Sequence, residues 1–166
     1  LGTLEQINVT PIKKYQFIIG KLFPFWVLGL VILTVGLLIA IVIFQVPILG
    51  NIMLIYAFTS VYLILILGIG LFISNHTDTQ QQAMFIAWFF TVIFILMSGL
   101  FTPVESMPIW AQKMTLLNPL RHLIDAIRLI MLKNSGFKDL IPQFISILGM
   151  AVFFNFWAVW NYRKTS

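Results

Sequence analysis

Residues that could carry acid–base or metal chemistry are scarce in this sequence, and their spacing forms no catalytic set. Of its 166 residues, 9% are charged and none is cysteine. The two histidines, His76 and His122, lie far apart in the chain, and neither belongs to a His-Glu-x-x-His zinc motif. His76 and Asp78 are close enough to share a metal ion, but two ligands without a third make a poor site. We therefore expect a solvated loop there, and neither a metal site nor a catalytic site.

Nucleotide and nucleic-acid chemistry are not expected of this chain either. The pair Gly20–Lys21 lacks the upstream glycine and the following Ser or Thr of a P-loop, and it leads into an apolar segment. The ten basic residues are scattered, so a net charge of +5 produces no dense basic face for a nucleic acid. The chain itself is expected not to be an enzyme and to hold no cofactor.

The elements that carry these few residues must lie in a lipid bilayer. Hydrophobic residues make up 60% of the chain, whereas about 45 to 50% is usual for soluble domains, whose charged share is about 25%. Too little polar surface remains to cover a soluble globule of this size. The composition thus predicts an all-α, polytopic membrane protein in contact with the lipid bilayer.

The uncharged runs predict four transmembrane helices. Between Lys21 and Asp78 there is no Asp, Glu, Lys or Arg, a run far longer than the about 20 residues that one crossing needs. Pro47 and the Gly50–Asn51 pair favour a turn within this run. Two more apolar runs follow. The expected spans are about 22–44, 51–73, 81–101 and 141–162.

The segment 102–140, between the last two spans, contains half of the basic residues and is expected at or outside the interface. Asn118–Pro119 reads as an N-cap followed by proline at the first helical position, and Gly136 lies where that helix should end. Apolar residues then recur at steps of three and four, which predicts an interfacial or re-entrant helix. A short helical piece is expected to precede it.

Arg121, Asp125 and Arg128 fall on the polar face of that helix, at i, i+4 and i+3 spacing. Such spacing allows local ion pairs. The charges can either pair with one another or face a substrate, and pairing is the favoured interpretation.

Residues 1–21 are predicted to be an amphipathic cytoplasmic segment. Thr3 and Gln6 have the spacing of a capping box, and Thr10–Pro11 restarts the chain into a second short helix. Four spans put both termini on one side, but the basic residues are divided equally between the two sides. We expect cytoplasmic termini, with 163–166 as the tail, because the terminal charges lie close to the spans.

Asn155 is the notable polar residue within the spans. An amide at mid-span needs a partner on another helix or a polar cavity. Helix packing is the favoured interpretation, and a place on a transport path is the alternative.

Two groups of motifs resemble the ABC-2 type transporter permeases, the membrane subunits of a class of ABC exporters. GTLEQ at 2–6, VTP at 9–11 and GK at 20–21 are similar to the cytoplasmic coupling segment of that family. SGLFTPVESMP at 98–108 and LNPLRH at 117–122 are similar to its outer re-entrant region. The family has six spans, so the resemblance leads us to expect that this sequence is a C-terminal part lacking two spans; a short four-span protein is the alternative.

The resemblance implies a function and a set of site residues. The chain would be the permease component of an exporter of a drug, lipid or polysaccharide, in the cell (inner or plasma) membrane, working with two cytoplasmic ATP-binding subunits and a second permease half, as a homodimer. Alternatives are a membrane-surface role for the N-terminal segment and a non-transporting scaffold role for the whole. The implied ATPase-coupling residues are Gly2, Thr3, Leu4, Glu5, Gln6, Ile7, Thr10 and Pro11. The implied outer gate comprises Pro103, Glu105, Pro108, Asn118, Pro119, Arg121, Asp125 and Arg128.

Overall fold

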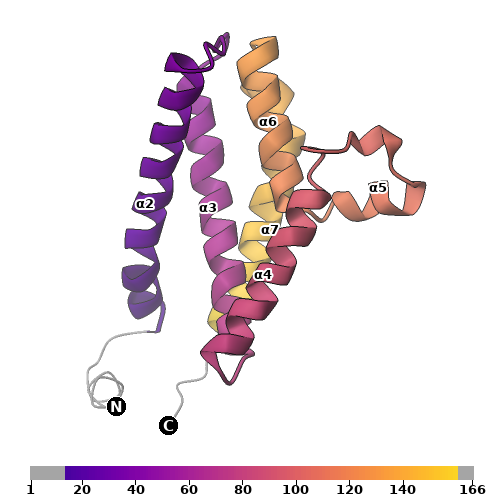
Figure 1. Ribbon diagram of the computed structural model, residues 1–166. Helices are drawn as coiled ribbons and strands as arrows, with labels where there is room; N and C mark the ends of the chain where they lie inside the picture. Colours follow the sequence, from indigo (N-terminus) through magenta and orange to yellow (C-terminus); the bar gives the residue numbers. More distant parts are fainter. Residues whose placement is uncertain (1–13, 161–166) are drawn as a thin grey trace.

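The computed structural model describes residues 14–160, and within that range it contains helices and no strand (Figure 1). The all-α prediction is therefore confirmed for this part of the chain. In chain order the elements are α2 (Lys14–Val42), α3 (Ile52–Asn75), α4 (Gln80–Leu96), η1 (Val104–Ser106), α5 (Ile109–Thr115), α6 (Pro119–Lys133), η2 (Phe137–Leu140) and α7 (Ile141–Trp160).

Three stretches, rather than the four expected, are long and apolar enough to cross a membrane. They are Ile18–Val42, Ile52–Asn75 and Phe137–Ala158. The third expected span, 81–101, corresponds to α4, which has 17 residues and a length of about 26 Å at 1.5 Å per residue. Its last residue is Leu96, because Ser98 and Gly99 form a turn in which Gly99 has a φ of +80°.

The first of these helices begins earlier than expected. Residues 14–21, assigned above to a separate cytoplasmic segment, are the first turns of α2 and continue without a break into the apolar span. Pro24 lies inside this helix. The expected coupling residues, from Gly2 to Pro11, lie outside the described residues.

The turn between α2 and α3 is where the sequence places it. Gln45 has a φ of +50°, and Asn51 caps α3 by accepting a hydrogen bond from the Met53 amide at 2.8 Å. Gly50 permits a close approach here, because a Cβ at this position would lie 2.3 Å from the Ile130 carbonyl oxygen on α6. The turn therefore packs directly against α6.

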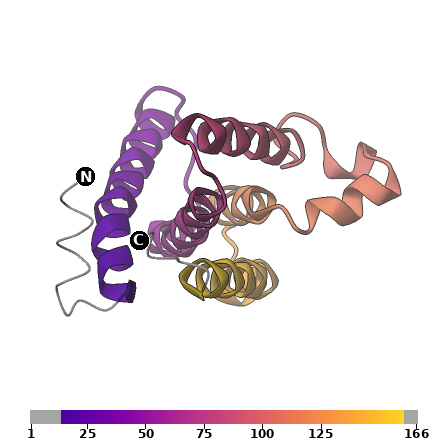
Figure 2. The same ribbon diagram turned by 90° about the horizontal axis from the view of Figure 1, so that it is seen from below.

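The core is formed by α3, α6 and α7. Its buried apolar residues are Ile55, Phe58, Leu65, Ile69 and Ile73 on α3, Leu123, Ala126, Ile130 and Met131 on α6, Leu140 in η2, and Ile147 and Ala151 on α7. By contrast, α4 has no buried residue, and Ile18 is the one buried side chain among those described on α2. Viewed from below, α2 and α4 flank the central helices (Figure 2). Most of the apolar side chains of α2 and α4 are thus exposed, as expected in lipid.

The ends of α6 differ in part from expectation. Asn118 is the N-cap and Pro119 the first helical residue, as predicted. The C-cap, however, is Asn134, which has a φ of +51°, whereas Gly136 has a φ of −81° and precedes η2. Asparagine tolerates the left-handed conformation through its short polar side chain, so the helix ends two residues before the glycine.

Candidate functional site

Several polar residues of the 102–140 segment, among them Asn118, Arg121 and Arg128, lie around the place where α4 ends and α6 begins. Residues 97–118, called the arm below, connect these two helices and contain η1 and α5. Both views show the arm projecting sideways from the bundle, and α6 lies above the upper end of α4 (Figures 1 and 2). The arm therefore separates α4 from α6 and projects away from the bundle between them.

Asn118 joins the two helices at this interruption. Its Nδ2 donates to the Phe94 carbonyl oxygen at 2.7 Å, one of the orphan carbonyls in the last turn of α4. Its Oδ1 accepts from the Leu120 amide at 3.0 Å, which caps the first turn of α6. The side chain is 3% exposed, so one buried amide satisfies the end of one helix and the start of the next.

Other polar side chains of the arm also satisfy helix ends. The Ser98 hydroxyl donates to the Ile95 carbonyl at 2.7 Å, and the Thr115 hydroxyl donates to the Gln112 carbonyl at 2.7 Å. The Gln112 amide donates to the Met107 carbonyl at 2.8 Å. These hydrogen bonds stabilise the conformation of the arm, and the donors that form them are not available to a ligand.

The three charges of α6 are engaged in different ways. Arg121 and Asp125 form an ion pair at 3.7 Å, as the i, i+4 spacing predicts. Arg121 also donates to the Thr115 hydroxyl. Arg128 does not join the pair, because its Nη2 donates to the Gly99 carbonyl at 3.1 Å across the junction. The pairing interpretation is thus confirmed for the first two residues, and Arg128 instead links α6 to the arm.

A cavity of about 210 Å³ lies between these charges and the arm. We call it the polar cavity; its lining residues are Gly99, Leu100, Phe101, Pro103, Val104, Glu105, Arg121, Asp125 and Arg128. Five of the eight residues predicted for an outer gate therefore surround one space. The other three, Pro108, Asn118 and Pro119, do not line it.

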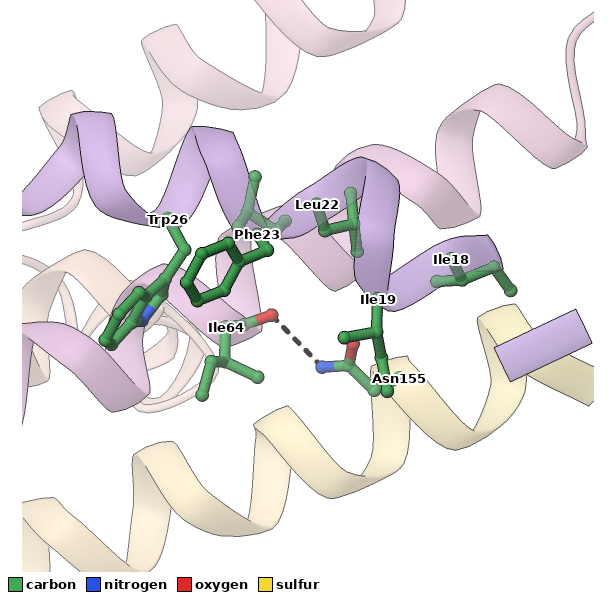
Figure 3. Close-up of a pocket in the computed structure, with 8 residues that line it drawn as sticks. Ile18, Ile19, Leu22, Phe23, Trp26, Ile64 and Asn155 are labelled. Carbon is green, nitrogen blue, oxygen red and sulfur yellow. Dashed lines mark hydrogen bonds between the residues drawn. The ribbon is translucent and has the colours of Figure 1, made fainter. Parts of the chain in front are cut away.

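A second space, of about 490 Å³, lies between α2, α3 and α7 (Figure 3). This apolar pocket is lined by Ile18, Ile19, Leu22, Phe23, Trp26, Ile64, Leu67 and Asn155. Asn155 contributes the one amide side chain of the lining, and the other lining residues are aliphatic or aromatic. Its Nδ2 donates to the Ile64 carbonyl on α3 at 3.1 Å and to the Ala151 carbonyl on its own helix at 2.9 Å. The expected partner on another helix is therefore present.

Two further contacts hold the helices around this pocket together, one made by Trp26, which the sequence reasoning does not identify, and one by Gly68, which it includes among the span glycines expected to allow close helix packing. Trp26 donates from Nε1 to the Ser60 carbonyl at 3.2 Å and so connects α2 to α3. Gly68 faces Asn155 so closely that an added Cβ would lie 2.6 Å from Nδ2. A glycine and an asparagine in two separate spans are a weak signal of this contact, since small residues allow helices to approach closely.

The two histidines serve backbone carbonyls in separate parts of the fold. His122 contacts the Leu116 carbonyl oxygen through Nε2 at 2.9 Å, and His76 contacts the Phe72 carbonyl oxygen through Nδ1 at 2.8 Å. Within residues 14–160, no group of three or more His, Cys, Asp or Glu side chains could hold a metal ion. Each histidine therefore has a structural contact in this part of the chain.

Residues 1–132 match the family model described as ABC-2 type transporter. The chain belongs to the ABC-2 type transporter family. The match includes α2, α3, α4, the arm and most of α6, so the polar cavity lies within the matched residues.

Among curated ABC-2 relatives, the chain is 39% identical over 135 residues to "Probable multidrug ABC transporter permease YbhR" of Escherichia coli, an alignment that covers 81% of this chain and 37% of that protein. It is 29% identical over 168 residues to "Inner membrane transport permease YhhJ" of the same species, covering 99% of this chain and 44% of that protein. It is also 31% identical over 160 residues to "ABC transporter G family member 20" of Dictyostelium discoideum, covering 95% and 22%.

The chain thus spans less than half the length of these relatives. No solved structure matches it significantly.

Proposed function

We propose that the chain is part of the membrane-spanning permease of an ABC exporter, powered by ATP hydrolysis in separate subunits. The observation that carries the proposal is the family match over residues 1–132, together with relatives whose names describe permeases. The three long apolar helices are consistent with a multi-pass inner or plasma membrane protein.

The proposed topology has four crossings, with α4 and α6 sharing one passage. α4 is short for a full crossing, but α6 lies above its upper end, and Asn118 joins the two. Irregular backbone at membrane depth is tolerated where it is buried in protein or lines a water-filled cavity. This supports assigning the arm and the polar cavity to an outer gate. The first turn of α2 and the last turn of α7 lie at the opposite end of the bundle, which we assign to the cytoplasm.

The apolar pocket is the proposed contribution of this chain to the transport path. Asn155 gives its wall one amide, which would orient a substrate that has a hydrophobic portion. The proposed substrate is a drug, a lipid or a polysaccharide. A second permease half, most simply another copy of the chain, would complete the path.

Coupling to two cytoplasmic ATP-binding subunits is assigned to residues 2–11. Leu4 and Ile7 would be the apolar contacts, and the polar rim would be formed by Glu5, Gln6, Lys13 and Lys14. Since α2 is continuous from Lys14 into the membrane, a movement at its cytoplasmic end would pass directly to the span.

Co-purification of the ATP-binding subunits tests this assignment. The Leu4→Ala, Glu5→Ala double variant of the full-length permease, co-expressed with these subunits, should retain less of them. Loss of contacts worth about 2 kcal/mol at an interface hot spot reduces association more than about tenfold.

The matched control is Leu132→Ala, Lys133→Ala, which changes one exposed leucine and one exposed charge at the far end of α6. The control should retain the subunits as the unmodified protein does. Undiminished association of the Leu4, Glu5 variant would contradict the coupling assignment.

A further inference from the structure

Two charges at the polar cavity have no opposite charge as a partner. The Glu105 carboxylate makes neither an ion pair nor a hydrogen bond with the described residues. Arg128 contacts the Gly99 carbonyl but no carboxylate in the same part of the chain. Both side chains line the cavity.

The charge arrangement around the cavity suits a zwitterion. Arg121 and Asp125 neutralise each other as an ion pair, which leaves one positive guanidinium and one carboxylate facing a shared space. A guanidinium presents a planar set of donors that fits phosphate oxygens, and a carboxylate accepts hydrogen bonds from an ammonium group. A ligand that carries both a phosphate and an ammonium group would satisfy both residues at once.

The rim of the cavity favours a lipid as the source of that chemistry. Leu100 and Phe101 line it and are 51% and 70% exposed, next to the apolar outer surface of α4. These exposed apolar side chains can contact the acyl chains of a lipid. A water-soluble phosphate compound has no acyl chains and would gain nothing from this contact.

We propose that this cavity binds the headgroup of a phosphatidylethanolamine-type lipid, with the phosphate at Arg128 and the ammonium at Glu105. The lipid is inferred from the charges, the volume of about 210 Å³ and the apolar rim. This site rests on the membrane location of the chain and is independent of ATP-driven export, so either proposal can fail alone.

Native mass spectrometry of the detergent-purified protein, titrated with lipid, tests the site. The probes are phosphatidylethanolamine, phosphatidylglycerol, which has the phosphate without the ammonium, and glycerophosphoethanolamine, which has the headgroup without acyl chains. The unmodified protein should bind phosphatidylethanolamine most tightly.

Substitutions separate the roles of the two charges. Arg128→Gln should weaken phosphatidylethanolamine binding about tenfold, because it removes a charged hydrogen-bond donor to phosphate. Glu105→Gln should weaken phosphatidylethanolamine binding but strengthen phosphatidylglycerol binding, because it removes the ammonium acceptor and a repulsive charge. The Glu105 side chain makes no hydrogen bond or ion pair in the described fold, so this second variant removes no such contact and tests the site with little effect on folding.

Lys113→Gln is the control, since Lys113 is an exposed charge of the arm that does not line the cavity. Equal loss of lipid in the Lys113 and Arg128 variants would overturn the proposal. Equal affinity of the unmodified protein for both lipids would also overturn it, and so would competition by glycerophosphoethanolamine as strong as that of the intact lipid.

Discussion

At the scale of single residues, Asn118 has two structural roles that one substitution can separate. Its oxygen caps α6, and its nitrogen satisfies the Phe94 carbonyl at the end of α4. Aspartate is about as good an N-cap as asparagine but has no amide donor. Replacing Asn118 with aspartate therefore measures the hydrogen bond to the Phe94 carbonyl separately from the cap.

We expect Asn118→Ala to lower the free energy of unfolding by about 2 kcal/mol or more, from about 1 for the lost cap and at least about 1 for a buried carbonyl left without a donor. Asn118→Asp should retain the cap yet remain destabilising, because its carboxylate would face the Phe94 oxygen. Reversible unfolding in mixed detergent micelles gives both values. An Asn118→Asp protein as stable as the unmodified one would show that the contact to α4 contributes nothing.

At the scale of elements, the packing of α3 against α7 depends on close contacts along both helices. Gly68 lies against Asn155 in the C-terminal half of each helix, and the Asn75 amide donates to the Ala158 carbonyl at 3.0 Å near the C-terminal ends. Phe58 and Phe144 make an edge-to-face contact with ring centroids 5.7 Å apart. Because lipid provides no hydrophobic force between helices, such contacts must hold the pair together.

Two glycines of α3 provide a matched test of this packing. A Cβ at Gly68 would lie 2.6 Å from the Asn155 nitrogen, whereas a Cβ at Gly70 would have no atom within 4 Å. Gly68→Ala should therefore be about 1 to 3 kcal/mol less stable than Gly70→Ala, which has the same gain in helix propensity but no overpacking.

Thermal unfolding in detergent measures the difference between the two variants. Adding Asn155→Ala to Gly68→Ala should relieve the clash, so the effects of the two changes should not be additive. Equal stability of the Gly68 and Gly70 variants would contradict the importance of this contact.

The sequence predicts elements better than it predicts their ends and contacts. The turn near Pro47 follows from proline, glycine and asparagine in an uncharged run. The end of α4 does not follow from hydropathy, because Leu100 and Phe101 are as apolar as the helix; a hydrogen bond from Ser98 and the positive φ of Gly99 set it.

The side-chain contacts of the site could not be predicted from the sequence either. Spacing alone allows Arg128 to pair with Asp125, but the folded chain brings the Gly99 carbonyl within reach instead. Likewise, the contact of Gly68 with Asn155 joins two distant spans, and no local pattern in either span encodes it.

At the scale of the whole molecule, the elements divide into a packed centre and a lightly attached exterior. α3, α6 and α7 share the buried core, whereas α2 and α4 present most of their apolar side chains outward. The loop between α3 and α4 lies at the same end as the first turn of α2, and the turn between α2 and α3 lies at the other end.

This arrangement leads to a prediction about sidedness. The sequence has no cysteine, so single-cysteine labelling needs no prior substitutions. Gln80 and Lys113 are both exposed. Gln80→Cys should react with a membrane-impermeant maleimide from the cytoplasmic side, and Lys113→Cys from the outside. Labelling of Gln80→Cys in intact cells would place this residue outside and contradict the proposed orientation.

The unbroken helix from Lys14 to Val42 has a mechanical consequence. It is a rod about 43 Å long, attached to its neighbours mainly along one side and with almost no buried side chains. A force at one end of such a rod tilts it as a lever, because the helix runs without a break from that end into the span, and Pro24, which removes one backbone hydrogen bond, is the point where it would bend most easily. The apolar pocket lies beside the first half of this helix, so a small tilt would change the width of that pocket while the core of α3, α6 and α7 stayed intact.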